Sequence, residues 1–454
     1  MLIVGGNQSA GGYEIANSIR YDKNASQYLR RTCGSSASSY TLSLWVKNCE
    51  PQGGSTTAIY WNGAGAKINW EFNGSSQIYW YDPETRTTGF YRDVGAWYHL
   101  VWKVSSNVGT LYVNGSADPG LTSVSSIDSL NSGNFIYLGS DAGAYSPQNG
   151  YFAEVCFIDG TALDPTSFGE YDEDSGIWKP IDVSGLSFGS NGFYLDFEDS
   201  SALGNDVSGN NNDLTSAGFT SLNQTTDTPT NNFSTMSPLI ASYSGAGISP
   251  ATFSEGNLNV SGSSTYWYTF GGFQVSQGKW YWEGKVLSIS GTYNGTGFGF
   301  QDMENLYDPS ASFPSNDIYV YGNTGDTRDP TNGATSYGSS YTTNDIIGIA
   351  MDLDNGYGYF SKNGVWQNSG DPESGASGTG AAFSLNPAAT GQFFAPYATD
   401  DSSGTSSVSF AMNFGSPTFT ISSGNSDADG YGNFEYAVPS GYYALCTKNL
   451  AEYG

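Results

Sequence analysis

The sequence predicts an all-β protein with two β-sandwich domains joined by a polar strap. Glycine is frequent, with 60 among 454 residues, and turn residues separate short runs of aromatic and β-branched residues. This pattern is typical of short strands connected by many hairpins. We find no amphipathic helix longer than two turns. The predicted domains are residues 1–222 and 249–454, with the strap at residues 223–248.

The first region contains strands in which side chains of two kinds alternate. Within residues 41–47 every second residue is aliphatic, and residues 97–104 repeat this alternation around Leu100 and Trp102. Successive side chains of a strand point to opposite faces of a sheet, so these segments present one face to a core. Further strands are predicted at residues 18–21, 28–30, 109–115, 135–139, 151–159 and 193–197.

Four of these segments follow one another in a recognisable order. The segments are W-Y-H-L-V-W, G-T-L-Y-V-N-G, I-Y-L-G and F-A-E-V-C-F-I-D-G-T-A-L. In this order they resemble the laminin-G-like, concanavalin-A-like jelly roll, over residues 16–165. The resemblance implies a jelly-roll sandwich, and some members of this type hold calcium at the rim of the sandwich. By the same resemblance, Asp141 lies in such a rim loop.

The strap is polar and has no periodicity between residues 223 and 232. Its apolar anchors are Phe233, Met236 and Leu239. We expect an ordered strap on the surface rather than a flexible tether.

The second region contains the clearest hairpin in the chain, at residues 344–364. Ile347, Ile349 and Met351 share one face of its first strand, and Asp354-Asn355-Gly356 forms its turn. This hairpin resembles the central hairpin of the SPRY (B30.2) domain. Four further segments match SPRY in order, at residues 278–283, 297–300, 394–397 and 412–415. SPRY domains bind partners through variable loops and perform no chemistry, so the resemblance implies a recognition protein.

The net charge of −28 limits the partners of this chain. A surface this negative repels phosphate backbones and anionic membranes, so we expect no nucleic acid partner. We also expect no membrane insertion, because no apolar run approaches the roughly 18 residues that span a bilayer. The apolar start of the chain covers four residues, which is too short for a signal peptide.

Four cysteines, Cys33, Cys49, Cys156 and Cys446, show no metal-binding or redox spacing. We expect free buried thiols. A bridge between Cys33 and Cys49 is the alternative, because both flank the same predicted strand region.

Two sets of residues are candidates for catalysis. His99 is the single histidine, and no G-x-S-x-G motif accompanies it, so we expect a structural or surface role. Alternation within residues 170–174 would place Glu170, Asp172 and Asp174 on one face of a strand. This loosely resembles the acidic strand of laminarinase-type enzymes, E-x-D-x-E. Turn-like flanks favour an exposed acidic loop instead, and we predict no enzyme activity and no catalytic residues.

Calcium is the predicted cofactor, if the chain holds one. Asn425, Asp427 and Asp429 place oxygen atoms at alternate residues before a glycine, which lets a loop curl around a hard cation. The loop departs from an EF-hand, since Asn takes the first position and the glutamate is one residue early. Asp141 and residues 206–213 are two further candidates, and a simple polar turn is the alternative at each place.

Aromatic residues provide the candidate ligand site. Tyr79, Trp80 and Tyr81 occupy both faces of one predicted strand, and an aromatic ring that does not face the core faces solvent or a partner. Trp366 lies, by resemblance, near the loops that SPRY domains use for binding. The alternative is that these rings fill the sandwich cores.

Residues 227–233 and 439–450 resemble structural proteins of tailed phages from marine hosts. We therefore predict a non-enzymatic virion protein, a tail fibre or surface decoration assembled in the host cytoplasm. Its predicted partners are host cell-surface glycan, other virion proteins and further copies of itself in a homo-oligomer. The alternatives are a polysaccharide-degrading enzyme that uses Glu170 and Asp172, and a capsid-cementing protein with no glycan ligand.

Overall fold

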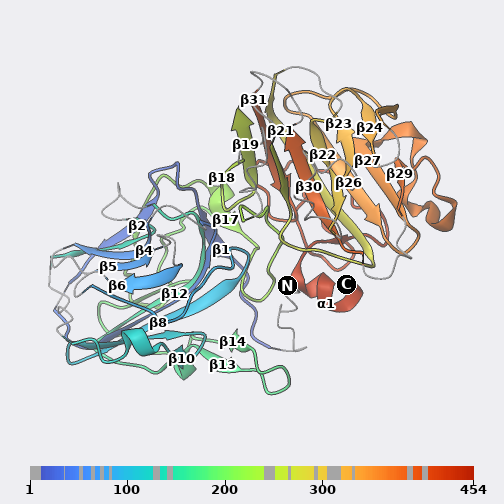
Figure 1. Cartoon of the computed structure of the whole chain (residues 1–454). Coiled ribbons are helices and arrows are strands. Elements are labelled where there is room, and N and C mark those ends of the chain that lie inside the picture. Colours follow the sequence, from blue (N-terminus) through green and yellow to red (C-terminus); the bar gives the residue numbers. More distant parts are fainter. Residues whose placement is uncertain are drawn as a thin grey trace. The chain divides into compact units, whose positions relative to one another are not determined.

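The described part of the chain is built from strands and loops (Figure 1). The computed structural model describes residues 12–34, 36–50, 55–62, 67–71, 76–80, 84–125, 133–140, 147–239, 251–263, 267–290, 295–303, 318–329, 333–385, 392–400 and 407–454. The single α-helix among them is α1, Thr447–Tyr453. The all-β prediction is confirmed, and the antiparallel sheets fit β-sandwich domains.

The chain divides into two compact units, and the boundary falls after Asn232. The first unit ends there and also includes Ser254–Gly256, and the second unit holds the rest from Phe233 onward. The predicted strap is therefore shared between them. Its first part belongs to the first unit because Asp227 forms a buried ion pair with Lys47, at 2.8 Å.

Two sheets enclose the core of the first unit. The eight-stranded sheet follows the order β10-β9-β8-β3-β12-β1-β17, with β15 beside β12, and the seven-stranded sheet follows β16-β2-β11-β4-β5-β6-β7. The strands of the eight-stranded sheet are β1 Ser18–Tyr21, β3 Tyr40–Asn48, β8 Trp97–Ser105, β9 Val108–Val113, β10 Ser116–Ala117, β12 Gly150–Asp159, β15 Phe193–Leu195 and β17 Gln224–Thr225. Those of the seven-stranded sheet are β2 Tyr28–Thr32, β4 Ser55–Asn62, β5 Lys67–Glu71, β6 Gln77–Trp80, β7 Thr85–Arg86, β11 Phe135–Leu138 and β16 Thr215–Ala217.

The predicted alternation positions the core residues. Leu42 and Leu44 of β3 and Trp102 of β8 point between the sheets and are at most 2% exposed. The opposite face of the eight-stranded sheet is also buried, which alternation alone did not predict. Residues after β12 cover that face, where Phe168 and Phe188 pack with Val101.

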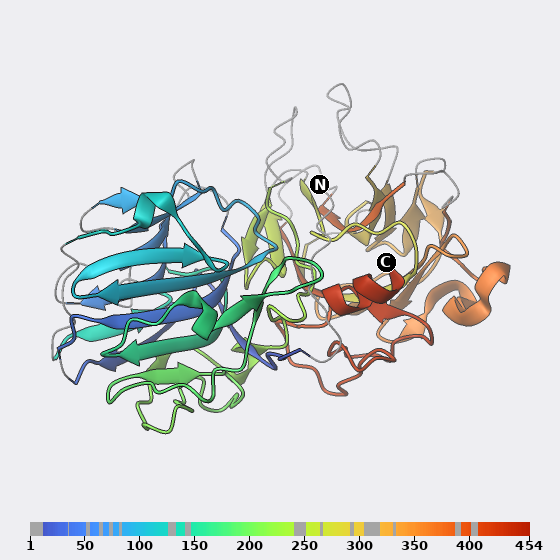
Figure 2. The same cartoon turned by 90° about the horizontal axis from the view of Figure 1, so that it is seen from below.

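This covering layer includes the hairpin of β13 Gly169–Tyr171 and β14 Trp178–Pro180. Three short 3-10 turns complete the first unit: η1 Pro119–Leu121, η2 Pro165–Ser167 and η3 Ser221–Asn223. Figure 2 shows the strands of this unit from below, with the β13–β14 region in green. The first unit thus has two sheets and a third, partial layer on one of them.

The second unit also has two sheets. The nine-stranded sheet follows β18-β19-β31-β21-β26-β27-β28, with β29 beside β27 and β32 beside β21, and the six-stranded sheet follows β20-β30-β22-β23-β24-β25. The strands of the larger sheet are β18 Thr252–Ser254, β19 Asn259–Ser263, β21 Lys279–Ile289, β26 Ile346–Asp352, β27 Tyr357–Lys362, β28 Val365–Trp366, β29 Phe383–Ser384, β31 Ser407–Asn413 and β32 Tyr443–Ala444. Those of the smaller sheet are β20 Trp267–Phe270, β22 Gly297–Asp302, β23 Ile318–Gly322, β24 Asp326–Arg328, β25 Thr335–Ser336 and β30 Phe394–Asp400, and two 3-10 turns are η4 Gln367–Ser369 and η5 Pro372–Ser377.

The predicted hairpin of the second unit is confirmed as β26 and β27. Ile347, Ile349 and Met351 are fully buried in the core of this unit. The turn closes as its residue types predict: the Asp352 carboxylate accepts from the Asn355 N–H at 2.9 Å, and Gly356 adopts a φ of +79°.

All four cysteines are buried free thiols, so the alternative bridge between Cys33 and Cys49 is not formed. Within the described residues, no helix has the length and apolar character needed to cross a membrane.

Candidate functional site

The predicted aromatic strand is β6, and its two described aromatic side chains point to opposite faces of the sheet, where both are buried. Trp80 points into the core, where its ring stacks on Trp102 with centroids 4.4 Å apart. Tyr79 points to the other face of the seven-stranded sheet, and the Arg86 guanidinium carbon lies 5.3 Å from its ring centroid. The structure therefore assigns Trp80 to the core rather than to a ligand site, and Tyr81 lies outside the described residues.

The same outer face carries a second group of rings around an arginine, on β2 and β11. The Arg30 guanidinium carbon lies 5.3 Å from the ring centroid of Phe135 and 5.9 Å from that of Tyr28. The rings of Tyr28 and Tyr137 meet edge to face at 5.7 Å. We call Tyr28, Arg30, Phe135 and Tyr137 the Arg30 cluster.

Strand pairing explains why these residues meet. Arg30 pairs with Tyr137 across β2 and β11, and with Thr215 across β2 and β16, and paired residues share a face. Leu29, between Tyr28 and Arg30, points into the core instead. Tyr28, Arg30 and Phe135 are partly exposed, and Thr215 is exposed, so the cluster presents rings, a cation and a hydroxyl to solvent.

A fixed loop after β7 displays another aromatic ring. Phe90 is 55% exposed, and the Arg92 guanidinium carbon lies 4.9 Å from its ring centroid. The buried Asp118 carboxylate holds this loop by accepting from the N–H groups of Thr88, at 2.8 Å, and Gly89, at 3.1 Å. Sequence reasoning missed both Phe90 and the Arg30 cluster. The signal that was available is the Tyr-Leu-Arg alternation in β2.

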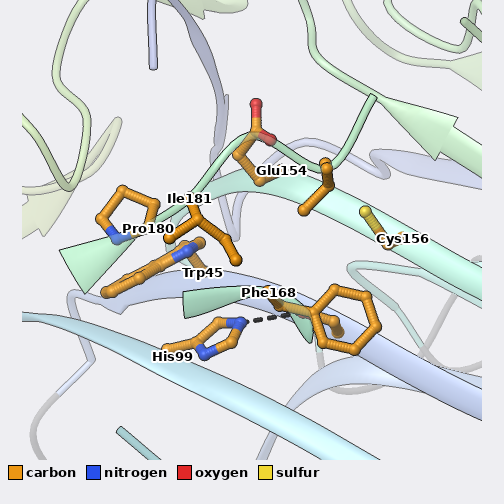
Figure 3. A pocket seen from close by; sticks show the side chains of 9 residues that line it. Trp45, His99, Glu154, Cys156, Phe168, Pro180 and Ile181 are labelled. Carbon is orange, nitrogen blue, oxygen red and sulfur yellow. Dashed lines mark hydrogen bonds between the residues drawn. The ribbon is translucent and has the colours of Figure 1, made fainter. Parts of the chain in front are cut away.

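A narrow pocket lies between the eight-stranded sheet and the covering layer (Figure 3). His99 forms part of its lining, and its ring stacks on Trp45 with centroids 4.7 Å apart. The Trp178 indole Nε1–H donates to His99 Nδ1 at 2.9 Å. An indole nitrogen donates only, so the imidazole proton is on Nε2 and points to Ser43 Oγ, 2.8 Å away.

This tautomer prevents His99 from acting as a base toward Ser43, because a base needs a free lone pair facing the hydroxyl. Burial also lowers the pKa of His99 to about 3, so the ring stays neutral. His99 is thus a buried structural residue, held between two tryptophans.

Glu154 lines the same pocket, and its carboxylate points away from His99 (Figure 3). It is the extra residue of a β-bulge, where the register of β12 against β3 shifts between Ala153 and Cys156, and its φ is +49°. The carboxylate accepts from the Tyr194 hydroxyl at 2.7 Å and from the Tyr13 hydroxyl at 3.2 Å. Burial raises the pKa of Glu154 to about 7, and the two hydroxyl donors oppose that rise.

Comparison with known proteins identifies the fold of the strands that carry the Arg30 cluster. Residues 23–166 match the Laminin_G_3 family model, described as the concanavalin A-like lectin/glucanases superfamily. This segment has the concanavalin A-like fold. It includes all of β2, β6, β7 and β11. The Arg30 cluster and the Tyr79–Arg86 pair therefore both lie on the concanavalin A-like sandwich.

Solved structures give weaker likenesses. The SPRY domain of human HERC1 is 18% identical over 34% of this chain and 87% of its own, with a TM-score of 0.26. A putative carbohydrate binding protein from Bacteroides ovatus is 15% identical over 45% and 59%, with a TM-score of 0.30. Domain 4 of AbnA, a Geobacillus stearothermophilus arabinanase, in complex with arabinotriose, is 23% identical over 29% and 65%, with a TM-score of 0.24. A search of curated proteins gave no match.

The acidic run after the concanavalin A-like segment forms part of the β13–β14 hairpin. Lys179 of β14 faces both carboxylates, at 3.4 Å from Glu170 and 3.2 Å from Asp172. Asp172 Oδ1 also accepts from the N–H groups of Asp174, at 3.2 Å, and Ser175, at 2.9 Å. The Ser175 donors and Lys179 lower the pKa of Asp172 to about 2. The Glu170 side chain is exposed as predicted, but it lies in strand β13 rather than in a loop, and Asp172 is buried and closes a turn.

In the predicted calcium loop, the Asp427 carboxylate accepts hydrogen bonds from the protein itself. Asp427 Oδ1 accepts from the N–H groups of Asp429 and Tyr431, and Oδ2 accepts from the Ala444 N–H and the Asn449 amide. Four donors occupy this carboxylate, so a cation would have to displace them. Asn425 turns its amide NH₂ to Ser423 and to the Phe434 and Glu435 carbonyls.

The other predicted calcium ligands do not form a more complete set of metal ligands among the described residues. Asp206 accepts from four donors of its own loop and of β15, among them the Asn212 N–H at 2.7 Å. Asp141 lies outside the described residues. Within the described ranges, no three His, Cys, Asp or Glu side chains gather as a metal site.

Trp366, in β28, is partly buried and packs against the cluster that contains Tyr359 and Phe434. Its neighbour Val365 is 66% exposed. The loop surface predicted for the second unit therefore shows the Val365 side chain to solvent, while Trp366 is partly buried.

Proposed function

We propose that this protein is a non-enzymatic recognition protein that binds carbohydrate on the outer face of the seven-stranded sheet. The observation that carries the proposal is the Arg30 cluster, in which partly exposed rings flank a guanidinium on a rigid sheet. A pyranose ring offers C–H groups that pack on an aromatic face, and a guanidinium donates to sugar oxygens. The exposed Arg86 extends this face, with the buried ring of Tyr79 beneath its guanidinium.

Binding assays on the full chain test the proposal directly. We expect a glycan array to give hits, and we expect the double variant Tyr28→Ala, Phe135→Ala to bind the best hit at least about tenfold more weakly. Val365→Ala is the control, since it removes an exposed aliphatic group from the second unit. Equal binding by both variants would contradict the site, and an empty array would favour the capsid-cementing alternative.

A polysaccharide-degrading role is the alternative of a different class. Hydrolysis of a glycoside needs two carboxyl groups, one of which is protonated at the working pH. Asp172 has a low pKa and four hydrogen-bond donors, which suits a turn better than acid catalysis. We expect no release of reducing ends from polysaccharide by the full chain. Release that the Glu170→Gln, Asp172→Asn variant abolishes would overturn the non-enzymatic proposal.

We further propose that the protein is a virion component of a tailed phage, as a tail fibre or surface decoration in a homo-oligomer with other virion proteins as partners. Support comes from the resemblance of residues 227–233 and 439–450 to structural proteins of tailed phages. Immunogold labelling of purified particles with an antibody against this chain tests the location. Unlabelled intact particles would contradict it.

A further inference from the structure

The cation at the centre of the Arg30 cluster is unusual in this acidic chain. The sequence has 43 Asp and Glu against 15 Lys and Arg, so most cations have carboxylates within reach. Lys47 pairs with Asp227, Lys103 with Asp164 and Lys179 with Asp172. Among the described residues, no carboxylate forms an ion pair with Arg30, which has aromatic rings as neighbours.

An unneutralised guanidinium between two rings is well prepared for an anionic group. The planar fork donates two parallel hydrogen bonds to a carboxylate or sulfate, and stacking on rings restricts its motion before binding. Thr32 and Thr215 lie beside it on the same face, and both are exposed. A neutral sugar would leave the charge of Arg30 without a partner.

The arrangement repeats on the same sheet and on its connecting loop. Arg86 lies over Tyr79 at the β7 edge, and Arg92 lies over Phe90 in the next loop. Five interstrand steps separate β2 from β7, a span of about 24 Å at about 4.8 Å per step. Arg86 also forms an ion pair with Glu84, at 3.2 Å. Arg92, like Arg30, forms no ion pair with a carboxylate among the described residues.

We infer that the ligand is an acidic polysaccharide, whose carboxylate or sulfate groups bind Arg30 while its sugar rings pack on Tyr28 and Phe135. This inference rests on the proposed carbohydrate-binding function and names the class of sugar. The net charge of −28 repels such a polymer at long range, but ions screen charges beyond about 8 Å at physiological salt. Local cations at the contact therefore decide the selectivity.

Charged and neutral forms of the same sugar test the preference for acidic sugars separately from carbohydrate binding itself. We would measure binding of the full chain to oligogalacturonate and to its neutral methyl ester, and to a sulfated galactan oligosaccharide and its desulfated form. We expect the charged member of at least one pair to bind about tenfold more tightly, and the preferred pair tells carboxylate from sulfate. The Arg30→Gln variant should lose this preference, while Arg30→Lys should keep part of it.

Lys103→Gln is the control, because it removes the same charge from the eight-stranded sheet of the same unit. Thermal melting of each variant checks that it is folded. Equal affinity for charged and neutral members, with binding still lost in Tyr28→Ala, Phe135→Ala, would overturn the acidic class and leave the proposed function standing. Binding to none of the sugars, and to nothing on a glycan array, would overturn both.

Discussion

Glu154 shows how one residue is set by its place in a strand. The bulge removes it from the alternation of β12, so Phe152 and Val155 both reach the core while Glu154 lies beneath the covering layer. A positive φ is costly for a residue with a side chain, and two tyrosine hydroxyls on the carboxylate offset part of that cost. The carboxylate thus ties Tyr13 and Tyr194 to the sheet.

The raised pKa of Glu154 makes stability depend on pH. Burial raises its pKa from 4.5 to about 7, so between these values the folded chain keeps a proton that the unfolded chain has released. The folded state therefore loses stability as pH rises from 4.5 to 7, by at most about 1.4 kcal/mol per pH unit. Glu154→Gln has no such proton, so its stability relative to the wild type should grow with pH in denaturant unfolding.

The titration of His99 does not affect the comparison of wild type with Glu154→Gln. Its pKa falls from 6.5 to about 3, so the unfolded chain binds the extra proton and stability falls as pH drops below 6.5. This slope has the opposite sign and is present in both proteins, so it cancels in their difference. A difference that stays constant from pH 4.5 to 7 would contradict the buried, protonated state of Glu154.

The thiols give a second prediction at the scale of residues. All four are buried, and burial raises the pKa of Cys33 to about 11 and that of Cys49 to about 12. The thiolate is the reactive form, so we expect almost no reaction with an aromatic disulfide reagent at pH 8 in the native state, and four thiols in denaturant. Two thiols in denaturant would indicate a disulfide instead.

Among the elements, the loop at residues 425–435 connects the C-terminal segment to the large sheet of the second unit. Asp427 is 6% exposed and joins its own turn to β32 and to α1 through Ala444 and Asn449. In the same unit, the buried Glu283 of β21 accepts from the Glu435 and Tyr436 N–H groups. Two carboxylates thus fasten the C-terminal segment to the large sheet.

Removing Asp427 should release that segment. Asp427→Ala leaves buried N–H groups without acceptors, and we expect a loss of about 3 kcal/mol of unfolding free energy. Faster hydrogen exchange at Ala444 and in α1 would report the release. The control is Asp429→Ala, because Asp429 is exposed and its carboxylate accepts from the Tyr453 hydroxyl. A wild-type melting temperature that rises with millimolar calcium, but not in Asp427→Asn, would instead support the calcium prediction.

For the whole molecule, charge dominates solution behaviour. The net charge of −28 favours solubility at neutral pH, and the sequence pI of about 4.1 places charge neutrality in mild acid. We expect light scattering to rise and solubility to pass through a minimum near pH 4, before unfolding is complete. A solubility that stays flat from pH 7 to 4 would contradict this prediction.

Much of the fold was accessible from sequence because its signals are local. Alternation in β3, β8 and β26 depends on the two-residue period of a strand, and the turn at residues 354–356 depends on which residues tolerate positive φ. The order of strands in residues 16–165 predicted the jelly roll, and the family match over residues 23–166 supports it.

The sites were less accessible because they depend on contacts distant in sequence. Tyr79 and Trp80 look alike in the sequence and both are buried, yet strand alternation packs Trp80 on Trp102 in the core and Tyr79 under Arg86 on the other face. Arg30 and Phe135 are more than 100 residues apart and meet only through the pairing of β2 with β11. The spacing around Asp427 resembles a metal loop, and only the tertiary structure shows the four donors that its carboxylate accepts from.

The sequence by itself determined the all-β class, the strand periods, the turns and the acidic surface, because each follows from residue type and near neighbours. Tertiary structure alone decided which strand face is covered, which rings surround an arginine, and which carboxylates are occupied by N–H donors. Those outcomes depend on sheet pairing and burial between distant segments, and no local pattern encodes them.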